Sequence, residues 1–111
     1  MTLQLRQQLT RDIPDTPGIY LIECLATGRK YIGAAIDMRR RVKDHLSLAE
    51  IGHNSLKDDF NNHGLATFRV EALEEVAAKN QLFNRELFWH SVFEGADLYN
   101  TEPPKQNRFW I

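Results

Sequence analysis

Two predicted helices each carry a polar, chemically capable side chain in the middle of an apolar stripe. In the helix predicted over residues 38–49, His45 lies within the stripe and Arg41, one turn earlier, lies at its edge. In the last predicted helix, about residues 80–93, Glu86 has apolar residues one turn away on either side. A buried imidazole or carboxylate needs a compensating partner, because an unpaired buried charge is costly.

Each of these side chains has a structural as well as a functional explanation. His45 could be a hydrogen-bonded core histidine, with Arg41 extending past it to solvent. Glu86 could form a buried ion pair with Arg41 or Arg85, or it could bind a divalent cation through oxygen ligands that suit Mg²⁺. Ionisable groups on the buried stripes of two separate helices favour one shared site.

A predicted β-hairpin adds two tyrosines to this set. Gly18-Ile19-Tyr20 and Tyr31-Ile32-Gly33 lie in runs rich in strand-forming residues, and Thr27-Gly28 between them is typical of a turn. A phenol has a pKa of about 10, so either tyrosine could act as a base only where a cation stabilises the phenolate. Arg41, Lys30 or a bound metal could supply that charge.

Glycine has a physical purpose at the outer position of each tripeptide. Gly18 and Gly33 lack a β-carbon, and we expect them either to adopt unusual backbone angles or to allow a phosphate backbone to approach closely.

The remaining elements must bring these residues together. Asp37 and Asn80 are predicted N-caps, and His63-Gly64 is predicted to end the middle helix. The order β-β-α-α-β-α predicts an α+β domain, a small three-stranded antiparallel sheet flanked by helices. Strands are predicted over residues 18–25, 30–33 and 67–73, and helices over 38–49, 56–62 and 80–93, after a short amphipathic turn or helix within 1–13.

Length and composition restrict the class of protein. The chain of 111 residues predicts one domain over residues 1–111, with a core at about 17–101, a short N-terminal extension and a C-terminal tail. Neither a signal peptide nor an apolar run of about 20 residues is present, so we expect a cytoplasmic protein with no membrane partner. Cys24 is the only cysteine and is expected to be a small core residue.

The charge distribution predicts limited contact with nucleic acid. A net charge of −1 argues against a protein that coats nucleic acid through bulk electrostatics. Arg39, Arg40 and Lys43 nevertheless gather on the polar side of one predicted helix, and they predict a local DNA-binding patch.

The ordered set of motifs resembles the GIY-YIG nuclease family over about residues 17–101. Both tripeptides of the family's signature are intact, and Arg41 follows Tyr31 by ten residues, as the family's helix-borne arginine does. His45 resembles a histidine of phage intron homing endonucleases, one turn after that arginine.

The likeness continues through the second half of the chain. Arg85-Glu86-Leu87-Phe88-Trp89 resembles the context of the family's metal-binding glutamate, and Asn100 resembles an asparagine near the end of the family's domain. His53 resembles a homing-endonuclease position, and Phe60-Asn61-x-His63-Gly64 extends the match.

The resemblance implies a GIY-YIG fold and metal-dependent hydrolysis of DNA phosphodiester bonds, with Mg²⁺ as cofactor and Mn²⁺ as a substitute. It implies that Tyr20 is the general base, with its proton passed to His45, although Tyr31 stays open as the alternative base. The implied catalytic residues are Tyr20, Tyr31, Arg41, His45 and Glu86, with Glu86 as the metal ligand and Asn100, His53, Lys30 and Gly33 in support.

Homing endonucleases also carry a linker and a separate DNA-reading module, whereas this sequence stops close to the end of the domain. We therefore do not expect sequence-specific homing. The DNA substrate stays open among single-stranded, duplex and branched forms, and a targeting protein or a homodimer is expected as a partner. The alternative functions are a catalytically silent GIY-YIG domain that binds nucleic acid or protein, and a small structural α+β domain. Against a silent domain, every expected catalytic position is filled.

Overall fold

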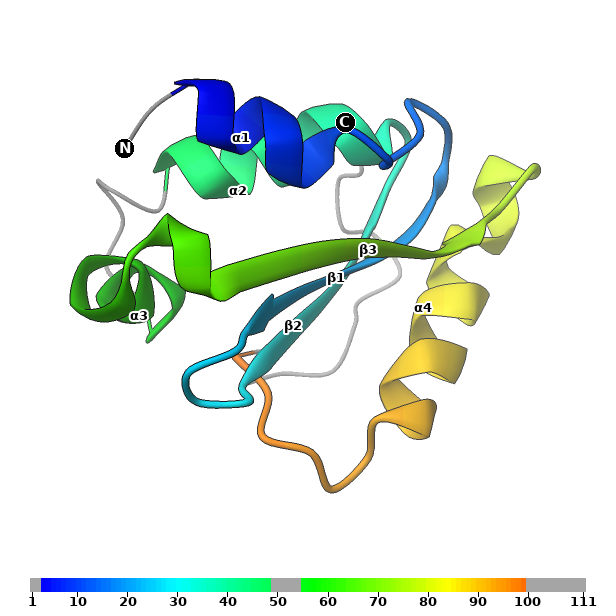
Figure 1. Ribbon diagram of the computed structural model, residues 1–111. Helices are drawn as coiled ribbons and strands as arrows, with labels where there is room; N and C mark the ends of the chain where they lie inside the picture. Colours follow the sequence, from blue (N-terminus) through cyan, green and yellow to red (C-terminus); the bar gives the residue numbers. More distant parts are fainter. Residues whose placement is uncertain (1–2, 49–54, 100–111) are drawn as a thin grey trace.

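A three-stranded antiparallel sheet lies between two helical layers (Figure 1). The computed structural model of the chain describes residues 3–48 and 55–99. The predicted α+β class and antiparallel sheet are confirmed. In chain order the elements are α1 (Leu3–Thr10), β1 (Gly18–Cys24), β2 (Lys30–Ala35), α2 (Met38–Leu48), α3 (Ser55–His63), β3 (Phe68–Glu75) and α4 (Leu82–Val92), with 3₁₀ turns at Leu65–Thr67 and Lys79–Gln81.

Strand β1 is the centre of the sheet, in the order β2-β1-β3. It pairs antiparallel with β2, so that Tyr20 lies opposite Gly33 and Ile22 lies opposite Tyr31. Its pairing with β3 shifts register between Ile19 and Tyr20. Because β1 has a strand on each side and a helical layer on each face, its apolar run is buried without interruption.

The two faces of the sheet support two separate cores. Side chains alternate along a strand, so Tyr20 and Ile22 face one layer while Ile19 and Leu21 face the other. The helices α1, α2 and α3 contribute to the first core, and α4 covers the second face (Figure 1). The first core includes Met38, Val42, Leu46, Leu56 and Phe60, and the second includes Ile32, Ala34, Val76 and Leu82.

Local signals at the ends of the helices are mostly confirmed. The Asp37 carboxylate accepts a hydrogen bond from the backbone N–H of Arg40 at 3.1 Å, as an N-cap does. Gly64 follows α3 with φ of 79°, a conformation that favours glycine. The prediction of Asn80 as a cap is wrong, because this residue lies within a 3₁₀ turn and α4 begins only at Leu82, without a side-chain cap.

Strands β2 and β3 are longer than the sequence pattern predicted. Gly18 at the start of β1 is paired with Ala35 on one side and with Glu75 on the other. The full length of β1 therefore sets the ends of both neighbours. Within the part of the chain that the structure describes, no helix is long and apolar enough to cross a bilayer.

Candidate active site

Tyr20 extends from β1 across its neighbour on β2. The side chain is 1% exposed, and a β-carbon built on Gly33 would lie less than 3.0 Å from the tip of the ring. Gly33 thus leaves the space that the phenol occupies. The expectation of unusual backbone angles at Gly18 and Gly33 is wrong, because the described glycines with positive φ are Gly28, Gly64 and Gly95. The close approach of a phosphate backbone stays a prediction.

Helix α2 places a histidine against this phenol. Met38, Val42 and Leu46 are 0% exposed and fix one face of α2 against the sheet, which directs His45 to the same side. The Tyr20 hydroxyl and His45 Nε2 are 2.9 Å apart, within hydrogen-bonding distance. The structure therefore assigns the core histidine a specific partner.

The second signature tyrosine joins the same cluster. The ring centroid of Tyr31 lies 4.9 Å from that of His45 and 6.3 Å from that of Tyr20. Tyr31 lies two residues before Gly33 on β2, and side chains alternate along a strand, so the Tyr31 side chain lies on the same face of the sheet as the Gly33 α-hydrogen that Tyr20 covers. The two tyrosines and the imidazole form one aromatic cluster between the sheet and α2.

Burial keeps the hydroxyl–imidazole pair neutral. It is the largest cause that raises the pKa of Tyr20 well above 10.0, followed by Tyr31 and Glu86, whereas Arg41 lowers it. Burial, followed by repulsion from Arg41, lowers the pKa of His45 from 6.5 to about 4. Near neutral pH the proton therefore resides on the phenol and the imidazole is uncharged.

Glu86 enters the site from the opposite layer. It is 0% exposed on α4, yet its carboxylate is close enough to raise the pKa of Tyr20. One alternative drawn from the sequence is an ion pair with Arg85, but the structure gives Arg85 another carboxylate as partner: its Nε donates a hydrogen bond to Glu74 at 2.9 Å. Also on α4, His90 Nε2 lies 3.9 Å from Glu86 Oε2.

The pattern of fold and site has counterparts among known proteins. A family model of the GIY-YIG catalytic domain matches residues 16–100. The chain belongs to the GIY-YIG family. The resemblance drawn from the two tripeptides is thereby confirmed.

Relatives of this GIY-YIG chain are endonucleases. Intron-associated endonuclease 1 of Enterobacteria phage T4 is 38% identical over 76 residues, which cover 65% of this chain and 31% of that protein. The chain thus spans about a third of that relative's length.

Two solved structures share the fold. The catalytic domain of the homing endonuclease I-TevI has a TM-score of 0.67 and 32% identity, covering 78% of this chain and 99% of that structure. A mutant form of the same domain has a TM-score of 0.69 and 29% identity, covering 80% and 96% of the two chains.

Lys30 does not lie with the other predicted site residues of the GIY-YIG domain. Its ammonium is 3.3 Å from the Glu23 carboxylate and donates to the carbonyl of Gly28 at 2.9 Å. Lys30 precedes Tyr31 by one position on β2, so its side chain points to the other face of the sheet. The prediction that Lys30 stabilises a phenolate is therefore corrected.

The predicted DNA-binding patch is more mixed in charge than the sequence suggested. Arg39 does not point freely to solvent, because its Nε donates to the carbonyl of Ile13 at 2.7 Å. Arg40 is exposed and Lys43 is half-buried. Three carboxylates share a hollow of about 290 Å³ with these cations; its lining is Asp15, Asp37, Arg39, Arg40, Lys43 and Asp44.

His53 and Asn100 lie outside the described residues, so their predicted supporting roles stay predictions. Within residues 3–48 and 55–99, no group of three or more His, Cys, Asp or Glu side chains is arranged to hold a metal ion. A single hard carboxylate such as Glu86 fits a cation that takes its other ligands from water and substrate phosphate, as Mg²⁺ does.

Glu74 was not among the predicted site residues, although its carboxylate accepts hydrogen bonds from both Arg85 and Trp89. The alternation of apolar and charged residues along β3 predicts a charged position there, but no local signal identifies partners on another element. Asp59 was not predicted either; it is buried and accepts a hydrogen bond from Tyr99 at 2.5 Å, although the two residues are 40 positions apart in sequence.

Proposed function

We propose that this chain is a metal-dependent endonuclease that hydrolyses phosphodiester bonds in DNA through one active site. The family and the endonuclease relatives support the class of reaction. The observation that carries the proposal for this chain is the 2.9 Å contact between the Tyr20 hydroxyl and His45 Nε2, in the electrostatic neighbourhood of Arg41 and Glu86.

The contact provides a route for the proton of the attacking water. In the tautomer protonated on Nδ1, His45 accepts a hydrogen bond from the Tyr20 hydroxyl at Nε2. As water attacks phosphorus, its proton passes to the Tyr20 oxygen while the phenolic proton passes to His45 Nε2. The phosphorus bond to the 3′-oxygen breaks, which leaves a 5′-phosphate and a 3′-hydroxyl once the leaving oxygen gains a proton.

Arg41 has two roles that follow from its charge. It lowers the pKa of Tyr20, which helps the phenol to give up its proton. It also repels the imidazolium form of His45, which keeps that ring free to accept a proton in the resting enzyme. In the transition state the guanidinium balances the charge that develops on the phosphate oxygens.

Tyr31 is assigned to position the scissile phosphate. Its ring packs beside His45 at 4.9 Å, and it is half-buried at the edge strand rather than enclosed like Tyr20. An exposed part of a phenol at the edge of the site can donate a hydrogen bond to a phosphate oxygen.

Glu86 is the residue that would hold the cation, Mg²⁺ or its substitute Mn²⁺. The carboxylate is fully buried beside a neutral phenol, so a bound cation would offset a charge that is costly to bury without a partner. When bound, the cation supplies positive charge that polarises the phosphate and stabilises the leaving oxygen.

The substrate is DNA, and one active site cuts one strand in each encounter. Cleavage of both strands then requires rebinding, a homodimer or a branched substrate. A net charge of −1 and a basic patch interrupted by carboxylates favour weak binding that a targeting protein strengthens.

Cleavage of labelled single-stranded, duplex and branched DNA, with and without Mg²⁺, tests the proposal. We expect cutting that requires the cation and is lost in Glu86→Ala. Glu94→Gln is the matched control, because Glu94 is an exposed carboxylate just beyond α4, and it should cut like the wild type. DNA binding without cutting by a folded wild-type chain would support the silent binding domain instead.

A further inference from the structure

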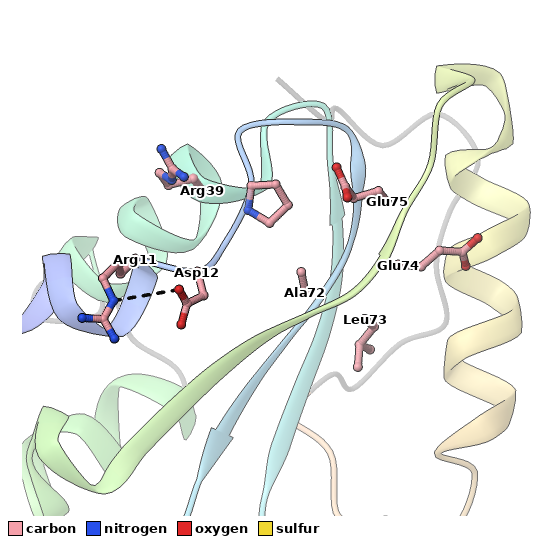
Figure 2. A pocket seen from close by; sticks show the side chains of 8 residues that line it. Arg11, Asp12, Arg39, Ala72, Leu73, Glu74 and Glu75 are labelled. Atoms are coloured by element: carbon pink, nitrogen blue, oxygen red, sulfur yellow. Dashed lines mark ion pairs between the residues drawn. The ribbon is translucent and has the colours of Figure 1, made fainter.

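Glu74 connects β3 to α4 through both of its carboxylate oxygens. Arg85 Nε donates to Oε1 at 2.9 Å and to Oε2 at 3.1 Å, and Trp89 Nε1 donates to Oε1 at 2.9 Å. Figure 2 shows Glu74 extending from β3 toward the last helix, whereas its neighbour Glu75 extends to the other side of the strand. Each of these three contacts joins residues 11 or 15 positions apart in sequence.

The two donors stand on either side of Glu86 along α4. Arg85 precedes it by one position and Trp89 follows it by three, so the turn of helix that carries Glu86 is held at both ends from β3. Leu82, fully buried in the second core, anchors the preceding turn. Together these contacts fix the rotation of α4 about its axis and hence the direction in which Glu86 points.

Gly18 allows β3 to come close enough for this connection. A β-carbon built on Gly18 would lie less than 3.0 Å from the backbone carbonyl oxygen of Glu74. The first glycine of the signature therefore sets the position of the strand residue that holds α4. The packing at Gly18 and the position of α4, which carries Glu86, are therefore linked through Glu74.

We propose that Glu74 is a positioning residue for Glu86: through Arg85 and Trp89 it directs the Glu86 carboxylate toward the cation and the phosphate. This inference rests on the proposed function, in which Glu86 holds the cation. Residues that orient a metal ligand, without touching the metal, typically change metal affinity by about 10- to 100-fold.

The positioning role differs from a merely structural one in what it changes. The side chains of Glu74 and Arg85 are 29% and 37% exposed, and ion pairs of that exposure add little to the stability of a fold. Removal of the Glu74 carboxylate should therefore alter the affinity for the cation much more than the unfolding temperature.

The experiment compares the full chain with Glu74→Ala, Glu74→Gln and Glu86→Ala in two assays. Mn²⁺ binding to the protein is measured by water-proton relaxation, and the Mg²⁺ concentration for half-maximal DNA cleavage is measured separately. Glu75→Gln is the matched control, since Glu75 is adjacent in sequence and instead accepts a hydrogen bond from Thr16 at 2.8 Å. Thermal unfolding of each variant is recorded alongside.

We expect Glu74→Ala to weaken Mn²⁺ binding by about 10-fold and to raise the half-maximal Mg²⁺ concentration similarly, with the maximal rate recovered at high Mg²⁺. Glu74→Gln keeps one acceptor oxygen and should fall between Glu74→Ala and the wild type. Glu75→Gln should match the wild type.

Two results would overturn the proposal, and they differ in whether the proposed function is rejected with it. Lost Mn²⁺ binding in Glu86→Ala, with wild-type affinity in both Glu74 variants, would reject the positioning role alone. Mn²⁺ binding that is absent from the wild-type chain, or unchanged in Glu86→Ala, would reject the assignment of Glu86 in the proposed function and the positioning role with it.

Discussion

The stability of the fold should depend on pH through His45. Burial and the nearby Arg41 lower its pKa from 6.5 to about 4 in the folded chain, while the unfolded chain keeps the ordinary value. Between these two values the unfolded chain binds the proton and the folded chain does not. The free energy of unfolding contributed by His45 is therefore fully present above pH 6.5 and is lost as the pH falls toward 4.

The size of this effect follows from the shift. The pKa falls by about 2.5 units, and each unit corresponds to about 1.36 kcal/mol, so the loss between pH 7.5 and pH 4 is about 3 kcal/mol. The groups facing the imidazole are Tyr20 of β1, Tyr31 of β2 and Arg41 of α2. The pKa of Tyr20 is raised well above 10.0, so its hydroxyl stays protonated over this range and does not reverse the sign.

Urea unfolding at pH 7.5, 6, 5 and 4, followed by circular dichroism, measures the effect in the wild type and in His45→Gln. Glutamine does not titrate and keeps an acceptor for the Tyr20 hydroxyl. Glu23 also makes the fold less stable in acid, because its pKa is lowered in the folded chain. Burial raises this pKa, but hydrogen bonds from Arg69 and Lys30 lower it by more. The measured quantity is therefore the difference between the two chains, which should shrink by about 3 kcal/mol from pH 7.5 to pH 4.

The prediction would be wrong if the free energy of unfolding fell with pH in parallel for the wild type and His45→Gln. Suppose that the difference in the free energy of unfolding between the wild type and His45→Gln changes by less than about 0.5 kcal/mol from pH 7.5 to pH 4. The folded chain would then protonate His45 as readily as the unfolded chain does. The imidazole would then be solvated, and the neutral pair with Tyr20 would not exist.

Three further substitutions test the packing that positions the site. Gly33→Ala should displace the Tyr20 ring, costing about 1–3 kcal/mol in urea unfolding and about 100-fold in the rate of DNA cleavage; an unchanged rate would contradict the close approach. Gly18→Ala should cost about 3 kcal/mol in the same unfolding assay, because the new methyl meets a backbone carbonyl of β3 as well as Met38, and a neutral result would contradict this geometry. Asp37→Ala should lower the free energy of unfolding by about 1 kcal/mol through loss of the α2 cap, with cleavage retained in proportion to the folded fraction.

Local patterns in the sequence predicted the elements well where one element alone decides the outcome. The stripe of Met38, Val42 and Leu46 determines which face of α2 is buried, and that face places His45 beside the sheet. The Asp37 cap and the turn at Gly28 likewise depend on interactions within a few residues. These features could be predicted because their causes are local.

Features that depend on pairing between elements could not be predicted in the same way. The ends of β2 and β3 are set by the length of β1, which no pattern within either strand records. Lys30 is a cation next to Tyr31 in sequence, but adjacent residues of a strand face opposite layers, so its side chain lies on the other face of the sheet. From the sequence, Arg41 and Arg85 were both possible ion-pair partners of Glu86, but Arg85 pairs with Glu74 on another element.

The electrostatic state of the site is also a product of packing between layers. Burial penalises the charged form of Tyr20 and the charged form of His45 alike, so the resting pair is neutral although each residue alone could ionise. The pKa of the phenol is held up by Glu86 and held down by Arg41, so any change that offsets the carboxylate lowers it. In the proposed function, a cation at Glu86 would do this, and an anionic phosphate beside His45 would favour the protonated imidazole, so the two pKa values would approach each other at the proton-transfer step. In the free protein, both residues are thus kept uncharged by their burial.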